Sequence, residues 1–405
     1  MKYILFIVTM LVATTTFSQK KFLFDASKAE TAGNADWVID ADKWNLDYSP
    51  NAHTGGYEAN AQKIPTPSQN NITSNTGEYY WTGALSSWGI ELVKKGYHVE
   101  TLPYNGDITY LNPGNPQDLS NYDVFVVCEP NIKFTSSEKS AIIQFVKDGG
   151  GLFMISDHNN SDRNGDGIDS PAIWNDLINN NSITSNPFGI KFDYEFFNEQ
   201  TNNIPNLPND PLLNGPYGKV TRVEFYGGTS MTLYPNQNNS VKGVVYEEGS
   251  STSGNKNVMC AYAVFGAGKV VALGDSSPAD DGTGDNGDNL YDGWLEDANG
   301  NHRKLIMNGS VWLATPASAI YNPQSIFGTI KAFGKDNTIK FAVNSNHPAE
   351  NFVVTVYDLT GRLLSSTKKT TADKQFEVSV PGAGLYLYRF SAQNRTVFTG
   401  KVMVQ

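Results

Sequence analysis

The sequence predicts an α/β protein in which a doubly wound, mostly parallel sheet is followed by an all-β sandwich domain. Up to about residue 315, short apolar runs of strand length alternate with stretches of helical periodicity. Such alternation favours helices packed on both faces of a parallel sheet. Beyond about residue 330, short segments with period-two alternation follow one another at hairpin spacing, which is typical of a small β-sandwich.

The first elements of the α/β part alternate regularly. The run KFLFDA at 21–26 is a short buried strand, and the stretch 82–97 has apolar residues at helical spacing. Gly96 ends this helix, because glycine adopts the left-handed conformation that closes many helices. The apolar run DVFVVCEP at 123–130 is the next core strand.

The later elements repeat this order. Thr135 and Glu138 form a capping-box signature at the start of a helix. That helix stops at three glycines, and the strand GLFMIS at 151–156 follows directly. A strand at 269–278 and a helix at 303–314 complete the pattern.

The chain divides into an export signal and two domains. Residues 1–18 have the basic start, short apolar core and small residues of a signal peptide. The α/β domain, predicted to be catalytic, spans 19–315, with a β-rich insertion at about 180–260 that is rich in Asn, Gly and aromatic residues. A linker at 316–330 leads to the β-sandwich at 331–405. No later stretch is long and apolar enough for a membrane span, so we expect an exported, soluble protein and, since nothing suggests more, a monomer.

Charge and cysteine content exclude some classes of function. The formal net charge is −11 and no basic stripe is present, so we expect no nucleic acid partner. The two cysteines, Cys128 and Cys260, both lie in apolar strand-like runs. We therefore expect buried thiols rather than a disulfide framework.

Charged side chains follow the predicted core strands at the point where each strand ends. Asp25, Glu129, Asp157 with His158, and Asp275 each come directly after an apolar run. Because ligands of such sheets bind beyond the carboxyl ends of the strands, we expect these five residues to converge and to carry catalysis. Paired carboxylates serve as acid and base or nucleophile, or hold a metal that activates water.

An acidic loop follows the strand at 151–156. Oxygen-bearing side chains at alternate positions around glycine turns suit Ca²⁺. The EF-hand's twelfth-position Glu is absent, since Ile173 stands there, and an ion-free Asx-rich turn remains the alternative. A second acidic cluster lies at 275–297. The predicted metal ligands are Asp162, Asn164, Asp166, Asp169, Asp280 and Asp281, and no nucleotide or organic cofactor is expected.

Two loops offer candidate substrate contacts. The first strand-to-helix loop contains Glu30, Asp36 and Trp37, and the indole of Trp37 either stacks on a sugar ring or packs the loop. Ser276 follows the late strand, but it lacks the Gly-x-Ser-x-Gly context of a nucleophile elbow.

The C-terminal part resembles the sorting domain of the type IX secretion system of Bacteroidetes. The matching motifs are VTVYDLTGRLL at 354–364, PGAGLYLYRF at 381–390 and the terminal GKVMVQ. This resemblance implies contact with the type IX secretion machinery, passage through the periplasm, and release or attachment at the cell surface.

Residues 20–315 resemble the class I glutamine-amidotransferase-like fold, including ThuA-like domains. The likeness rests on the run from LSNYDVFVVCEPN to GGGLFMISDHN, and it implies a flavodoxin-like sheet. In that family the strand after such a helix delivers a nucleophilic Cys. Here Ser156, Asp157 and His158 stand at that position, and GDSSPADD at 274–281 lacks the family's late His. The resemblance therefore implies the fold without glutamine hydrolysis.

Together these features predict a secreted hydrolase of an extracellular polymer, most simply a polysaccharide cleaved by a glycosidase. One alternative is a metal-dependent esterase, phosphoesterase or nuclease that uses the same acids. The other is a non-enzymatic, calcium-stabilised glycan-binding or surface protein.

Overall fold

The structure is a computed structural model, and it describes residues 19–33, 35–40, 69–284, 291–315, 329–344, 351–370, 372–392 and 395–404. The signal peptide predicted at 1–18 and most of the predicted linker, 316–328, lie outside these residues. The chain forms two compact units, Met1–Ala314 and Thr315–Gln405.

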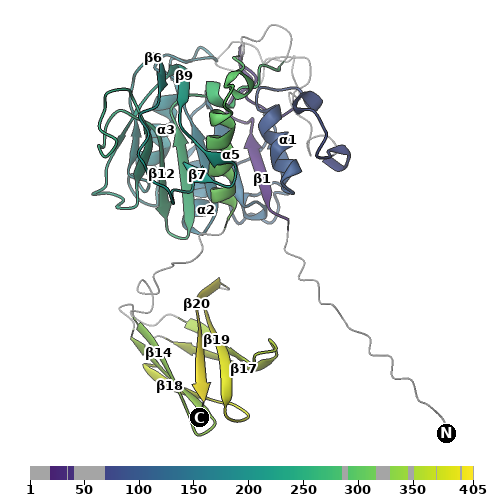
Figure 1. Cartoon of the computed structure of the whole chain (residues 1–405), viewed down its shortest axis with the longest axis vertical. Helices are drawn as coiled ribbons and strands as arrows, with labels where there is room; N and C mark the ends of the chain where they lie inside the picture. The colour runs from purple at the N-terminus through teal and green to yellow at the C-terminus, as the bar shows by residue number, and fades with distance from the viewer. Residues whose placement is uncertain are drawn as a thin grey trace, which may run out of the picture. The chain divides into compact units, whose positions relative to one another are not determined.

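A sheet rich in parallel pairs forms the centre of the first unit (Figure 1). Its parallel strands stand in the order β2-β1-β3-β4-β13. They are β1 (Lys21–Asp25), β2 (His98–Leu102), β3 (Val124–Cys128), β4 (Gly151–Ile155) and β13 (Gly268–Leu273). The sheet continues with antiparallel pairs through β12 (Val258–Phe265), β10 (Met231–Leu233) and β5 (Ile190–Phe192), and β11 (Lys242–Tyr246) also pairs with β12.

Helices cover both faces of this sheet. Successive side chains of a strand point to opposite faces, so the buried apolar residues of each strand pack against both helical layers. On one face lie α1 (Ser86–Lys94) and α5 (Asn301–Ala314), which contact each other, and α5 packs over β4 and β13 (Figure 1). The Trp88 indole packs edge-on against Phe153 at 5.0 Å and donates to Ser310. The other face carries α2 (Ser136–Lys147) and α3 (Ser170–Asn179). The α/β prediction with a mostly parallel sheet is confirmed at this level.

The capping residues expected at the ends of these helices are present. Thr135 and Glu138 form a complete capping box at the start of α2. Asp169 caps α3, since its side chain accepts from the Ala172 N–H. Gly96, after α1, has φ +92°, a conformation that glycine adopts readily.

The region at 180–260 contributes strands of two kinds. Some extend the central sheet, as above. Others form a separate two-stranded antiparallel ribbon of β6 (Phe197–Thr201) and β9 (Val223–Gly228), labelled at the upper end of the unit in Figure 1. The short elements are β7 (Asn214–Gly215), β8 (Gly218–Lys219), η2 (Gln69–Asn71), η3 (Glu78–Tyr80), η4 (Leu119–Asn121), η5 (Ser277–Ala279) and α4 (Gly293–Glu296).

The second unit is mostly β. Its seven strands form one sheet in the order β17-β16-β19-β20-β14-β15-β18. They are β14 (Thr329–Lys335), β15 (Thr338–Asn344), β16 (Asn351–Tyr357), β17 (Leu363–Thr370), β18 (Gln375–Ser379), β19 (Gly384–Ala392) and β20 (Arg395–Val404).

This sheet curls around one core, where Phe341 of β15 packs against Phe390 of β19. The all-β prediction is right, but the predicted two-sheet sandwich is replaced by a single, nearly barrel-shaped sheet. The reason is the parallel pair Gly334↔Val404, which joins β14 to β20 and so connects the two halves.

Candidate functional site

The candidate site lies at the carboxyl edge of the parallel strands. Asp25 ends β1, and Glu129, Asp157 and Asp275 come just after β3, β4 and β13. These four strands are consecutive neighbours in the sheet, so their ends lie along one edge. All four carboxyl groups are buried. The structure thus places at one edge the strand-end acids singled out in the sequence.

Glu129 occupies the most constrained position at this edge. Its φ is +50°, a left-handed conformation that is uncommon for a residue with a side chain and that often marks functional sites. The side chain is fully buried. Arg163 donates to its carboxylate from Nε at 2.6 Å, and the Ser276 hydroxyl donates at 3.2 Å. The strained backbone therefore points a buried carboxylate at a guanidinium and a hydroxyl.

Asp157 lies beside Glu129 and shares the same cation. Its Oδ2 is 3.4 Å from a terminal nitrogen of Arg163, and its Oδ1 accepts from the His158 N–H at 2.7 Å. Burial raises the pKa of Asp157 well above its usual value, and the neighbouring charges of Glu129 and Asp275 raise it further. A carboxyl group with a raised pKa keeps its proton near neutral pH and can act as an acid.

His158 places a ring nitrogen next to this acid. Its Nδ1 lies 2.6 Å from the carbonyl oxygen of Asn159, so in the neutral ring Nδ1 carries the proton and Nε2 the lone pair. Nε2 is 4.0 Å from Asp157 Oδ2. The ring also meets Phe196 edge-on at 4.5 Å. An acid and a base therefore stand next to each other.

Asp275 holds the end of β13 against the ribbon. Its Oδ1 accepts from both the N–H and the hydroxyl of Ser277 at 2.9 Å, and its Oδ2 accepts from the Tyr226 N–H at 2.5 Å. Burial raises the pKa of Asp275 to about 7. The contacts of this carboxyl group with the backbone of β9 fix one wall of the site.

A cavity of about 370 Å³ opens above these groups. Four aromatic side chains, Trp37, Phe196, Tyr226 and Tyr291, stand among polar and charged groups in its wall, and the Tyr226 and Tyr291 rings lie 3.8 Å apart. The lining residues are Trp37, Asp157, His158, Arg163, Phe196, Asn198, Tyr226, Gly227, Ser276, Ser277, Asp280 and Tyr291. Among the predicted site residues, the cavity thus gathers Asp157, His158, Trp37, Ser276 and Asp280.

Three acids of the first loop lie outside the cavity wall. Asp25 accepts from the N–H and hydroxyl of Ser27 through Oδ1, and burial raises its pKa to about 6. Glu30 is fully buried and accepts from the Lys28 N–H; burial raises its pKa well above the usual value. Asp36 is also buried. The structure therefore separates these three residues from the groups that face the cavity.

Asp280 and Asp281 have backbone partners of their own. Asp280 accepts from the N–H groups of Gly282 and Tyr291, and burial raises its pKa to about 8. Asp281 accepts from the Ser87 N–H at the start of α1, where the helix dipole favours a negative charge. Asp280 thus stabilises the backbone at Gly282 and Tyr291, whereas Asp281 stabilises the start of α1.

The acidic loop 162–169 is organised by its own backbone. Asp162 accepts from the N–H groups of Asp166 and Gly167, and Asp166 accepts from Ile168 N–H. Asp169 is engaged as the cap of α3. Within the described part of the chain, no three His, Cys, Asp or Glu side chains gather as a metal site. Calcium at this loop stays a prediction, carried by Asp162, Asn164 and Asp166.

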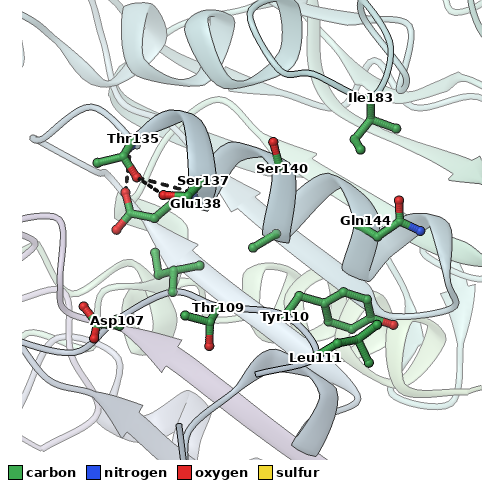
Figure 2. A pocket seen from close by; sticks show the side chains of 12 residues that line it. Asp107, Thr109, Tyr110, Leu111, Thr135, Ser137, Glu138, Ser140, Gln144 and Ile183 are labelled. Atoms are coloured by element: carbon green, nitrogen blue, oxygen red, sulfur yellow. Dashed lines mark hydrogen bonds between the residues drawn. The ribbon is translucent and has the colours of Figure 1, made fainter. Parts of the chain in front are cut away.

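A larger cavity, of about 730 Å³, lies elsewhere, over α2 and the segment 107–111 (Figure 2). Figure 2 shows Glu138 turned back onto Thr135, as the capping box requires. Glu138 also pairs with Lys28 at 2.7 Å. Its carboxylate therefore already has structural partners, and no strand-end acid lines this cavity. We place the candidate site at the smaller cavity for this reason.

Sequence reasoning missed Arg163 and the aromatic wall. Arg163 lies inside the loop read as a calcium motif, yet it is the one cation in the run SDRNGDGIDS, which is the signal that identifies it as a partner for nearby acids. Asn198 and Tyr226 come from the β6–β9 ribbon and Phe196 from the residue just before it, far along the chain from the strand ends. No local pattern joins them to Asp157.

Comparison with known proteins identifies the C-terminal part. Residues 336–405 match the family model of the secretion system C-terminal sorting domain. The protein is thus secreted by the type IX system to the cell surface or the extracellular space. Such a domain also implies contact with the secretion machinery. No helix in the described part of the chain has the length and apolar character of a membrane span.

Solved structures show weaker likenesses to the chain. The N-terminal domain of mmIFT52 has 13% identity and a TM-score of 0.39, covering 73% of this chain and 97% of that one. Dimeric latent PorU from Porphyromonas gingivalis has 26% identity and a TM-score of 0.16, covering 18% of this chain and 9% of its own. A mutant β-glucosidase from Listeria innocua has 12% identity and a TM-score of 0.16, covering 96% and 46%. These TM-scores are too low to carry an argument. No curated protein matches the chain.

Proposed function

We propose that the α/β unit is a secreted hydrolase of a glycan, with Asp157 as the acid and His158 as the base. The observation that carries this proposal is the 4.0 Å approach of His158 Nε2 to Asp157 Oδ2 at a cavity whose wall combines four aromatic rings with polar groups. Aromatic faces with a few polar groups suit sugar rings. The type IX sorting domain supports action outside the cell.

The distance between Asp157 Oδ2 and His158 Nε2 indicates which type of bond is cleaved. Inverting glycosidases separate their two carboxyl groups by roughly 6.5–9.5 Å to leave room for water. The acid and base here are much closer. Inversion at an anomeric carbon places water and the leaving group on opposite faces. At an ester carbonyl, both oxygens belong to one tetrahedral intermediate, so an adjacent acid and base can serve both events. The geometry therefore favours an acyl ester on the glycan over the glycosidic bond that the sequence suggested first.

In the proposed reaction, His158 Nε2 takes a proton from water as the water oxygen attacks the carbonyl carbon. Asp157 gives its proton to the departing sugar oxygen as the C–O bond breaks, releasing the acid and the alcohol. His158 then releases its proton to solvent and Asp157 takes one up, which restores both groups. Arg163, held by Glu129, stabilises the negative charge that develops in the cavity.

The flavodoxin-like scaffold is also part of this proposal. The order β2-β1-β3-β4-β13 places the acids at the edge where such sheets bind ligands. Cys128 is buried within β3, so it does not offer a nucleophile of the amidotransferase type.

The test is product analysis with the mature full chain. Acetylated and deacetylated neutral polysaccharides are incubated with wild type, His158→Gln and Asp25→Asn, and acetate and reducing ends are both measured. We expect acetate release that falls in His158→Gln and persists in Asp25→Asn, a strand-end acid outside the cavity. Reducing ends without acetate would restore the glycosidase hypothesis. Saturable binding without any product would favour the glycan-binding alternative.

A further inference from the structure

The β6–β9 ribbon has a solvent-facing side that the catalytic proposal does not use. Its strands β6 and β9 pair with each other in a sheet of their own, separate from the central sheet. Its inner side carries Val223 and Phe225, both fully buried in the core, with the Phe225 ring stacked on Phe197. Burial of this side fixes which residues point outward, because side chains alternate along each strand.

The outward side is polar with one aromatic ring. Asn198 pairs with Tyr226, and Gln200 pairs with Glu224, so these four residues form two adjacent cross-strand pairs on one face. Tyr226 is 39% exposed, and its hydroxyl donates to Glu224 at 2.5 Å. Gln200 is exposed. An aromatic ring beside amide and carboxylate groups is the chemistry that recognises a sugar ring and its hydroxyls.

This face continues the wall of the cavity. Asn198 and Tyr226 line the cavity, and Asn198 Oδ1 also accepts from the Gly227 N–H at 2.7 Å, which fixes that corner. Gln200 and Glu224 lie one pair further along, a step of roughly 6.6 Å for two residues of a strand. A chain with one unit in the cavity would therefore place its next unit on the second pair.

The charges around this face indicate which type of polysaccharide it can bind. Glu224 and Glu296 are the acidic groups that act on the Tyr226 and Tyr291 rings. Arg222, the basic residue at the far end of the ribbon, is paired with Asp297 at 3.4 Å. A polyuronate or sulfated chain would meet negative charge there.

We propose that the outward face of the β6–β9 ribbon binds further units of a linear, neutral polysaccharide whose reacting unit occupies the cavity. This proposal rests on the proposed function and names its substrate class. It assigns Gln200 and Glu224 to binding of the extended chain.

The experiment measures binding as a function of chain length. The full chain carrying Asp157→Asn is titrated calorimetrically with cello-, laminari- and manno-oligosaccharides, from disaccharide to hexasaccharide. We expect at least one series in which the hexasaccharide binds about tenfold more tightly than the disaccharide. Adding Gln200→Ala and Glu224→Ala should remove this difference. Gln237→Ala, a change of an exposed glutamine in another loop, should preserve it.

The outcomes separate the two proposals. Length dependence that survives in the double variant overturns the role of the ribbon and leaves the cavity's function standing. Equal affinity for a hexameric polyuronate overturns the choice of a neutral chain. If none of the oligosaccharides binds while the same protein without Asp157→Asn still releases acetate from acetylated polysaccharide, the extended-chain inference fails alone. Neither binding nor product means that both proposals fail.

Discussion

Two acid-rich regions of the α/β unit lie close together in sequence and are stabilised differently. In the loop 162–169, Asp162 and Asp166 accept backbone N–H groups of the same loop. At the strand ends, Glu129 and Asp157 are buried around Arg163 and away from water. The loop acids keep access to solvent and to a cation, whereas the strand-end acids depend on one guanidinium and on bound protons. Burial, rather than the number of acids, therefore distinguishes the two regions.

The largest expected effect tests whether the buried acid is the reactive one. Asp157→Asn removes the transferable proton while keeping the shape of the side chain. We expect turnover to fall by about 10²–10⁴-fold, the usual contribution of general acid catalysis. The matched change Asp166→Asn in the loop should alter turnover less than tenfold, by roughly under 1.4 kcal/mol. Equal losses in the two variants would erase the distinction between the regions.

The second prediction concerns the guanidinium that the buried acids share. Arg163→Met leaves Glu129 and Asp157 buried without their cation, so we expect the free energy of unfolding to drop by about 3–5 kcal/mol. Adding Glu129→Gln should recover part of this loss. Urea denaturation measures both. Arg222→Met, which breaks a more exposed pair with Asp297, serves as the control, and a loss as large as that of Arg163→Met would contradict the prediction.

The third prediction follows from protons held by buried acids. Burial raises the pKa of Asp25 to about 6 in the folded chain, compared with about 3.9 when unfolded. The stability it contributes is complete below the unfolded value and is lost as pH rises through about 6. Asp275 and Asp280 act in the same direction, toward about 7 and about 8. We expect stability to fall between about pH 4 and pH 8.

The variant Asp25→Asn isolates the contribution of Asp25 to this fall of stability with pH. The amide keeps an oxygen for Ser27 and carries no charge, so its stability relative to wild type should rise by about 2–3 kcal/mol between pH 4 and pH 8. Denaturation curves at the two pH values provide the measurement. A pH-independent difference would show that Asp25 is not protonated in the folded chain.

The smallest expected effect concerns calcium at the loop. Calcium that binds Asp162, Asn164 and Asp166 in the folded chain alone stabilises it by mass action, by about 1 kcal/mol at moderate excess over Kd. We expect the melting temperature to rise with calcium and to return to the apo value with EDTA. Asp166→Ala should abolish the response. A calcium response unchanged in that variant would move the ion away from this loop.

Sequence patterns predicted the sheet and the places where its strands end, because apolar runs and capping residues are local signals. They therefore located Asp157 and His158 correctly at the end of β4. They also made Asp25 a catalytic partner and Glu30 a substrate contact, although both are buried and neither lines the cavity. Which way a strand-end side chain turns depends on the backbone conformation and on neighbours distant in sequence.

The positive φ of Glu129 and the partnership of Arg163 show this limit. The sequence around Glu129 (CEPN) does not predict a left-handed conformation. The sequence around Arg163 (SDRNG) does not predict that its side chain binds Glu129. Likewise, the wall formed by Asn198 and Tyr226 depends on how the ribbon packs on β13, through Asp275 and the Tyr226 N–H. These are tertiary contacts, and period and spacing along the chain do not encode them.

The two buried thiols give the molecule internal reporters of its own opening. Cys128 lies in β3 directly before Glu129, and Cys260 lies in β12 of the antiparallel part. Burial raises the pKa of both thiols above the usual value, so each reacts with an alkylating reagent when its strand is exposed. The labelling rates of Cys128 and Cys260 thus report separately how often the parallel and the antiparallel parts of the sheet open, in the unaltered chain. A ligand bound at the strand ends should lower the labelling rate of Cys128 more than that of Cys260.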